Sequence, residues 1–155
     1  MQVLVSRFRV EATERGVRRL RYGRGADRST PSGRRHAARA RRELGQYLAG
    51  RRTVFSVPLD LAGLPPFQAK VLAEAARIPY GRTRSYTDLA RRAGRPGAAR
   101  AVGNALATNP VPILIACHRV IRRDGTWNHY AFGGWMKTRL LALERPAPRR
   151  GRDRS

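Results

Sequence analysis

The chain has 155 residues, enough for one domain, or for a main domain with a small lobe, around a buried core. Its 33 basic and 10 acidic residues give a formal net charge of +23, which favours a polyanionic partner such as a nucleic acid. The single cysteine excludes an internal disulfide and a multi-thiolate zinc site, and no apolar segment approaches the roughly 20 residues that span a bilayer.

The first third of the sequence predicts a small α/β lobe over residues 1–62, without a catalytic group. Apolar and β-branched residues alternate over 1–10 and 17–22, on either side of a short polar turn, and predict a β-hairpin. Residues 23–35 are rich in Gly, Ser, Arg and Pro, which predicts a mobile surface loop. The rest is predicted as a helix over 36–49, a strand over 54–57 and a linker over 58–65.

Residues 63–145 predict a second, mainly helical domain. Its first elements are a helix from Pro66, a turn at 78–81, a helix over 86–93, a break at 94–97 and a helix over 98–108. Ser85 and Asp88 have the spacing of a capping box at the start of the first short helix. Two short helices joined by a Gly-containing turn outline a helix-turn-helix, with 98–108 in the recognition position. Many helical hairpins of this outline bind nothing.

The remaining elements follow the single cysteine. They are a strand into an Asp-Gly turn over 120–126, an aromatic and glycine loop over 130–134, and a helix over 135–144. Residues 146–155 are rich in Pro and Arg and predict a disordered basic tail. The predicted fold class is therefore α/β, with a small amino-terminal α/β lobe followed by a mainly helical domain that holds a helix-turn-helix and an active-site cysteine loop.

The cysteine, Cys117, ends an apolar run and opens a polar Cys-His-Arg cluster. A thiol near its reference pKa of about 8.5 is mostly protonated at neutral pH, so a nucleophilic cysteine needs a base or a positive field. His118 and Arg119 supply candidates for both. The alternative is a buried structural cysteine beside two surface residues.

Several short motifs around Cys117 occur together in a fixed order. They are Phe67-Gln68, Ile78-Pro79-Tyr80-Gly81, Ser85-Tyr86, residues 98–103, Asn109-Pro110, Cys117-His118-Arg119-Val120, Gly125, Tyr130 and Glu144. In this order and spacing the chain resembles the O6-alkylguanine-DNA alkyltransferase (methylated-DNA–protein-cysteine methyltransferase) family, closely over 66–144 and loosely over the amino-terminal lobe. The family usually has proline directly before the cysteine, where this chain has Ala116.

The resemblance implies catalytic roles for Cys117, His118, Glu144, Tyr86 and Asn109, with no metal and no cofactor. Cys117 takes the alkyl group, His118 draws off the thiol proton through a water, and Glu144 orients His118. We expect this relay to lower the thiol pKa below its reference value. Tyr86 donates to the guanine ring, and Asn109 bonds the turn around the cysteine. Without the resemblance, Tyr86 reads as a packing aromatic residue, and Asn109 as a helix C-terminal residue.

The resemblance also implies how DNA is bound. The target base has to be flipped out of the duplex, and Arg100 inserts into the vacated place while its small neighbours let the helix lie in the minor groove. The predicted DNA contacts are Arg100, Ala98, Ala99, Ala101, Gly103 and Ser85. Arginine also suits phosphate contacts, although a GC-rich coding sequence gives the same arginine excess, and Arg100 has a plain surface residue as its alternative.

A pocket for the flipped base and its alkyl group is predicted from residues on both sides of the cysteine. Its members are Leu106, Val120, Tyr130, Ala131 and Phe132. Ala131 offers only backbone groups, and Leu106 fits a place in the core equally well. His36 and His129 have no predicted partner, and we expect both at the surface.

These expectations describe a single-turnover DNA-repair protein, a monomer in the cytoplasm that associates with the nucleoid through DNA. Its substrate is O6-alkylguanine in double-stranded DNA, with O4-alkylthymine as a second candidate. One alternative is a non-catalytic helix-turn-helix protein that recognises alkyl damage or other DNA, and another is a cysteine hydrolase. A pure binding module needs none of Asn109, Cys117-His118 or Glu144, so their presence favours the alkyltransferase.

Overall fold

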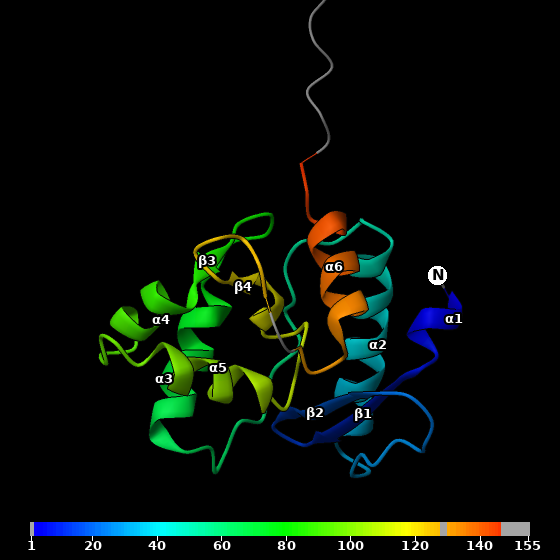
Figure 1. Cartoon of the computed structure of the whole chain (residues 1–155). Coiled ribbons are helices and arrows are strands. Elements are labelled where there is room, and N and C mark those ends of the chain that lie inside the picture. The colour runs from blue at the N-terminus through cyan, green and yellow to red at the C-terminus, as the bar shows by residue number, and fades with distance from the viewer. Residues whose placement is uncertain (1, 128–129, 147–155) are drawn as a thin grey trace, which may run out of the picture.

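The structure is a computed structural model, and it describes residues 2–127 and 130–146 (Figure 1). The amino-terminal part holds α1 (Gln2–Val5), β1 (Phe8–Thr13), β2 (Gly16–Tyr22) and α2 (Arg34–Leu48). The carboxyl-terminal part holds α3 (Pro66–Ala76), β3 (Arg84–Ser85), α4 (Tyr86–Arg92), α5 (Ala99–Ala107), the 3-10 helix η1 (Cys117–Arg119), β4 (Val120–Ile121) and α6 (Gly134–Leu143). Figure 1 shows α3, α4 and α5 grouped at one end of the molecule and the β1–β2 hairpin with α2 at the other.

The predicted hairpin is confirmed, but it begins later than expected. Strands β1 and β2 pair antiparallel from Phe8 opposite Tyr22 to Thr13 opposite Gly16. Because β2 ends at Tyr22, residues before Phe8 have no strand to pair with, and residues 2–5 form the short helix α1 instead of the predicted strand. The inner face of the hairpin packs on α2 and places Phe8 in the core.

The loop that was predicted to be mobile is hydrogen-bonded along the free edge of β1. The backbone N–H of Val10 donates to the Asp27 carboxylate at 3.1 Å, and the N–H of Ala12 donates to the Ser29 hydroxyl at 3.1 Å. Arg41 of α2 also pairs with Asp27. Polar side chains of the loop therefore accept hydrogen bonds from backbone N–H groups of β1 that have no neighbouring strand to pair with.

The strand predicted over 54–57 is wrong, because its backbone bonds to a side chain and not to a neighbouring strand. The Glu43 carboxylate accepts the N–H groups of Ser56 at 2.9 Å and Val57 at 3.1 Å, and the Ser56 hydroxyl at 2.7 Å. Backbone pairing resumes in the predicted linker, where Val17 donates its N–H to Pro58 at 2.9 Å. A buried carboxylate thus holds this connection against α2.

The predicted helix-turn-helix is confirmed as α4 and α5, which pack on each other and on α3. The Ser85 hydroxyl accepts the N–H of Asp88 at 3.0 Å, which is the predicted cap of α4. In α5 the residues Val102, Ala105 and Leu106 face the core. The opposite side of α5 is left for contacts outside the fold.

A two-residue parallel pairing sets the geometry of the site. Arg84 lies opposite Val120 and Ser85 opposite Ile121, which joins β3 to β4. The residue after β3 is Tyr86, and the three residues before β4 begin with Cys117. This pairing therefore brings the start of the helix-turn-helix beside the cysteine, although 31 positions separate Tyr86 from Cys117 in the chain.

One cluster of buried apolar residues runs through both parts of the chain, from Phe8 in β1 to Leu140 in α6. The division between residues 62 and 63 stays a prediction. The tail over 146–155 was predicted to be disordered, and its residues 147–155 lie outside the described part of the chain, as does His129. His36, expected at the surface, is partly exposed and contacts the backbone oxygen of Glu14 at 3.1 Å.

We predict that Glu43→Gln destabilises the protein and flattens its acid unfolding profile. Burial alone raises the pKa of Glu43, but hydrogen bonds from Ser56, Val57 and Arg39 outweigh it and lower the pKa from 4.5 to about 2. A lowered pKa means that Glu43 stabilises the fold above about pH 4.5, and that this stabilisation disappears as the pH falls towards 2. At neutral pH the substitution should cost about 1–3 kcal/mol.

Urea unfolding followed by circular dichroism at neutral and acid pH measures this difference. Glu11→Gln, on the outer face of the hairpin, is the matched control and should change little. Equal acid sensitivity of Glu43→Gln and the wild-type protein would contradict the assignment.

Candidate active site

The side chain of Asn109 closes the loop that presents Cys117. Its amide nitrogen donates to the Ile115 carbonyl at 3.2 Å, and its amide oxygen accepts the N–H of Val111 at 3.0 Å. Asn109 is itself buried, two residues after the end of α5. One side chain that follows α5 therefore closes the cysteine loop, and the catalytic role of Asn109 stays a prediction.

The same loop stores backbone strain at Ile113, which has a φ of 73°. A β-branched residue in the left-handed region costs on the order of 1–3 kcal/mol and persists only where surrounding contacts impose it. The Asn109 bonds and the bond from the Ile115 N–H to the Val111 carbonyl, at 3.0 Å, impose it here. Ala116 has a φ of −76°, close to the value that a proline ring fixes, so the loop keeps at this position the conformation of a proline.

His118 and Glu144 form a buried pair directly behind the cysteine. The imidazole Nε2 lies 2.8 Å from the Glu144 Oε1, and neither side chain is exposed to solvent beyond 1 %. Burial alone raises the pKa of Glu144, but hydrogen bonds from His118, Arg119 and Tyr47 lower it to about 2. An ionised carboxylate only accepts hydrogen bonds, so Nε2 carries the proton and Nδ1 has a free lone pair. Within the described residues, Nδ1 has no hydrogen-bond partner.

Two further side chains bind Glu144, and one of them could not be found from the sequence. Arg119 donates from Nε to Oε2 at 2.8 Å and from Nη2 to Oε1 at 2.7 Å, so its guanidinium faces the carboxylate. Tyr47 of α2 donates its hydroxyl to Oε1 at 2.6 Å. No local pattern marks Tyr47 for this role, because 97 positions separate it from Glu144.

The expected lowering of the thiol pKa is wrong for the free protein. Cys117 is only 3 % exposed, and burial raises the pKa of its thiol because the thiolate loses its hydration. Asn109, Lys137 and Tyr130 offset part of this effect. Burial also lowers the pKa of His118. The resting site therefore holds a protonated thiol beside a neutral imidazole.

Lys137 is a second residue that the sequence analysis missed. Its ammonium is buried, donates to the Val120 carbonyl at 2.6 Å, and lies over the rings of Trp127 at 5.7 Å and Tyr86 at 5.9 Å. Burial lowers the pKa of Lys137 to about 8, and the nearby Cys117 raises it in part. Lys137 thus remains a cation at neutral pH and favours the thiolate form of Cys117.

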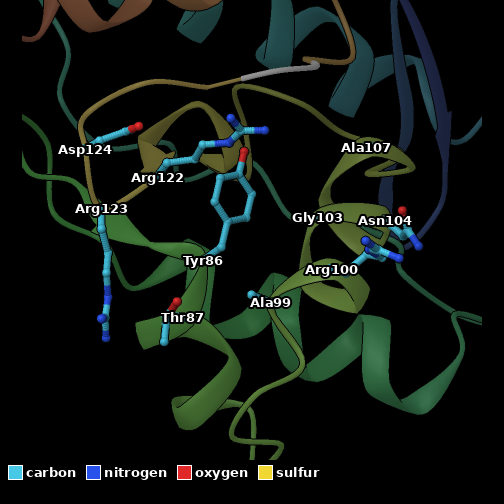
Figure 2. A pocket seen from close by; sticks show the side chains of 10 residues that line it. All are labelled: Tyr86, Thr87, Ala99, Arg100, Gly103, Asn104, Ala107, Arg122, Arg123 and Asp124. Atoms are coloured by element: carbon cyan, nitrogen blue, oxygen red, sulfur yellow. The ribbon is translucent and has the colours of Figure 1, made fainter.

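Tyr86 lines a cavity of about 710 Å³ between α5 and the turn after β4. Figure 2 shows its ring rising from the start of α4 towards Arg122, while Arg100 and Asn104 lie on α5 across the cavity. Burial and the nearby Cys117 raise the pKa of Tyr86, whereas Arg122 lowers it. The net effect is a phenol that stays protonated and is able to donate.

The predicted DNA contacts fall on or beside this cavity. Arg100, Ala99 and Gly103 line it, whereas Ala98 and Ala101 belong to the start of the same helix and Ser85 caps α4. The opposite wall adds Arg122, Arg123 and Asp124, which the sequence analysis did not assign. A groove with arginines on both walls is suited to an anionic ligand.

The predicted base pocket is divided in the structure. Leu106 and Val120 are buried in the core. Tyr130 lies near the His118 ring at 6.4 Å and packs on Phe132 at 6.0 Å. Phe132 and Ala131 line a separate cavity of about 400 Å³ together with Asn109 and strand β2. The joint role of these five residues stays a prediction.

No group of three or more His, Cys, Asp or Glu residues that could hold a metal ion occurs among residues 2–127 and 130–146. Within the same residues, no helix combines the length and the apolar character that crossing a membrane requires.

Comparison with known proteins places this arrangement in a family context. A family model described as "6-O-methylguanine DNA methyltransferase, DNA binding domain" matches residues 66–146. The inducible methylated-DNA–protein-cysteine methyltransferase of Bacillus subtilis is 48 % identical over 105 residues, which cover 68 % of this chain and 58 % of that protein. The methylated-DNA–protein-cysteine methyltransferase of Mycolicibacterium paratuberculosis is 50 % identical over 103 residues, 66 % of this chain and 62 % of that protein. The alignments thus span less than two thirds of these relatives.

Solved structures agree with the chain over a longer range. The O6-methylguanine methyltransferase of Mycobacterium tuberculosis superposes with a TM-score of 0.75 at 34 % identity, covering 92 % of this chain and 96 % of that one. The structure of Mycobacterium tuberculosis OGT in complex with DNA superposes with a TM-score of 0.74 at 40 % identity, covering 86 % and 85 %. The predicted α/β fold class, including the small amino-terminal lobe, is confirmed.

We predict that Lys137→Met raises the pKa of Cys117. The substitution keeps an unbranched side chain of similar length but removes the cation that favours the thiolate. A pH titration of the thiolate ultraviolet absorbance measures the midpoint, and Lys70→Met, on the exposed side of α3, is the matched control. Superimposable titrations for Lys137→Met and the control would mean that Lys137 acts only through its bond to Val120.

Proposed function

Because this chain belongs to the 6-O-methylguanine DNA methyltransferase family, we propose that it repairs DNA by transferring the alkyl group of O6-alkylguanine to its own Cys117. It is then a methylated-DNA–[protein]-cysteine S-methyltransferase. The observation that carries the proposal is the buried His118–Glu144 pair beside the thiol, with Nδ1 of His118 free to accept a proton. Proton transfer gives the free Nδ1 of this pair a role that DNA binding alone does not require.

The reaction is a displacement at a saturated carbon, for which a thiolate is a suitable soft nucleophile. The Cys117 sulfur forms a bond to the alkyl carbon as the bond from that carbon to guanine O6 breaks. The electron pair of the broken bond stays on the guanine. No redox step occurs, and the chain needs no metal or cofactor for this transfer.

The thiol proton leaves through His118. Since the resting thiol is protonated and the imidazole neutral, the thiolate forms when Nδ1 takes the proton, through one water as the family resemblance implies. Glu144 then stabilises the imidazolium through the 2.8 Å contact to Nε2. Lys137 supplies a fixed positive charge near the developing thiolate.

We assign Tyr86 to the stabilisation of the departing guanine. A departing guanine is an anion until it is protonated, and the raised pKa keeps the Tyr86 phenol in its donating form. The β3–β4 pairing holds this phenol beside the cysteine loop. Donation from Tyr86 to the guanine ring therefore neutralises the leaving group where it forms.

Access to guanine O6 requires that the nucleotide leave the stacked duplex, at a cost of a few kcal/mol. We assign Arg100, exposed on α5, to the space that the base leaves, and the small residues Ala99 and Gly103 to close approach of α5 to a minor groove. The surrounding arginines bind phosphates and release counterions.

The product is a thioether, which has no hydrolytic exit in this site, so each molecule reacts once. The partner is double-stranded DNA containing O6-alkylguanine, with O4-alkylthymine as a second candidate. The proposed reaction needs only the Cys117 thiol and the His118 general base, which one chain supplies. We therefore propose that the protein is a monomer. We propose a cytoplasmic location in association with the nucleoid, because the substrate is DNA and the thiol has to stay reduced.

We predict that Cys117→Ser abolishes alkyl transfer and leaves DNA binding largely intact. A serine hydroxyl is a far poorer nucleophile at saturated carbon, and the thiol is too buried to contribute a large contact to DNA. Mass spectrometry of the wild-type protein after incubation with O6-methylguanine DNA should show one added methyl group, on Cys117. A methyl group elsewhere, or turnover beyond one equivalent, would contradict the proposal.

We predict that Arg100→Ala slows repair of duplex DNA far more than reaction with free O6-alkylguanine base, which needs no flipping. The matched control is Arg123→Ala, on the opposite wall of the cavity. It should weaken DNA binding and reduce the salt slope by about one, with little change in the rate at saturating DNA. Equal losses on duplex and free base for Arg100→Ala would mean that Arg100 supports the fold of the site.

A further inference from the structure

The amino-terminal lobe reaches the catalytic pair through one side chain, Tyr47 of α2. We propose that Tyr47 is a positioning residue for alkyl transfer, whose hydroxyl holds the Glu144 carboxylate and tunes how strongly His118 takes up the thiol proton. This inference rests on the proposed function, and it gives the amino-terminal lobe a part in the chemistry.

The geometry leaves the Tyr47 hydroxyl little choice of partner. Tyr47 is fully buried, and its hydroxyl lies 2.6 Å from Oε1 of Glu144 and 3.4 Å from Nε2 of His118. Its ring packs against Phe55 at 5.2 Å and stands edge-on to Tyr80 at 6.1 Å. These contacts hold the ring, so that the hydroxyl points at the oxygen that His118 uses.

The carboxylate receives a dense set of donors. Oε1 accepts from Tyr47, from Arg119 at 2.7 Å and from His118 at 2.8 Å. Oε2 accepts from Arg119 at 2.8 Å and from the N–H of Gly81 at 3.4 Å. A buried hydroxyl needs only one acceptor, and a backbone carbonyl would suffice for its stability. The Tyr47 hydroxyl instead donates to Oε1 of Glu144, the same oxygen that His118 contacts. This shared acceptor couples Tyr47 to the proposed proton transfer.

The effect on proton uptake has a definite sign. A donor on Oε1 stabilises the negative charge of Glu144, so less of that charge is available to stabilise a protonated His118. Burial and the Glu144 charge raise the pKa of Tyr47, so the phenol stays protonated and keeps donating. Removing the hydroxyl therefore raises the proton affinity of Glu144 and, through it, that of His118.

Other titratable groups face Tyr47 or the His118–Glu144 pair and stay in place when the Tyr47 hydroxyl is removed. They are Arg119, Tyr80, Lys137, Tyr130 and the adjacent Cys117. Because these groups are common to the wild-type protein and the variant, a difference between the two in pH dependence reports the hydroxyl.

The test is Tyr47→Phe, which keeps the ring and removes the hydroxyl. Single-turnover transfer from saturating O6-methylguanine duplex is measured against pH. A raised proton affinity of His118 moves the acid limb of the profile to higher pH. The rate should fall roughly three- to tenfold at about pH 5.5 and approach the wild-type rate by about pH 8. Tyr80→Phe is the matched control, since its hydroxyl donates to the Leu143 carbonyl at 3.3 Å and not to Glu144.

A second substitution should shift the acid limb of the pH profile in the opposite direction. Difluorotyrosine at position 47 is a more acidic phenol and a stronger donor, so its acid limb should move to lower pH. A purely structural Tyr47 would change the melting temperature and the folded fraction, but the profiles of both variants would superimpose on that of the wild type after correction for folded protein. Superimposable profiles overturn the proposal.

Nuclear magnetic resonance of the His118 ring separates this inference from the proposed function. Its titration midpoint should rise in Tyr47→Phe and stay unchanged in Tyr80→Phe, whether or not the protein transfers a methyl group. A wild-type protein that transfers no methyl group would overturn the proposed function. An unmoved midpoint would overturn the role of Tyr47 alone.

Discussion

The buried carboxylate of Glu144 joins three segments of the chain to the end of α6. Tyr47 reaches it from α2, Gly81 from the turn before β3, and His118 and Arg119 from η1. A buried charge is tolerated only where its lone pairs are satisfied, and removing one partner of a buried ion pair typically costs about 3–5 kcal/mol. The elements that carry the proposed chemistry are therefore held by an interaction that the fold itself needs.

The few acidic residues of this strongly basic chain lie mostly at structural junctions. Glu43 holds the connection after α2, and Asp88 at the start of α4 pairs with Arg84, Arg91 and Arg92. Asp27 ties its loop to Arg41. Such placement leaves much of the arginine surface without neutralising partners. In the hairpin, Arg9 even lies directly opposite Arg21, a like-charge pair that a sheet tolerates at a small cost.

The parts of the site that sequence could predict are those encoded by local patterns. The cap formed by Ser85, the two short helices and the adjacency of Cys117 to His118 all follow from residues close in the chain. Glu144 came from the resemblance to a family, and the structure brings it to His118. Tyr47 and Lys137 were missed because their roles depend on tertiary contacts that no short motif records.

Errors of prediction have a similar origin. The strand over 54–57 has the right apolar pattern, but its backbone donors were already taken by a carboxylate from another element. The thiol pKa was expected to fall because the His118 imidazole is adjacent in the sequence and the family resemblance implies that Glu144 orients it. In the fold Arg119 turns to Glu144, and burial dominates at Cys117. The residues next to Cys117 in the sequence therefore do not determine the pKa of its thiol.

The shielding of Cys117 bears on how long an unreacted molecule remains useful. Peroxide and small electrophiles react with exposed thiolates, whereas this thiol is 3 % exposed and has a raised pKa. Under the proposed function each molecule reacts once, and the chain has a single cysteine, so no second thiol could replace Cys117. Burial and the raised pKa thus slow the loss of the thiol to such reagents, and in the proposed reaction they leave it available for the alkylated base.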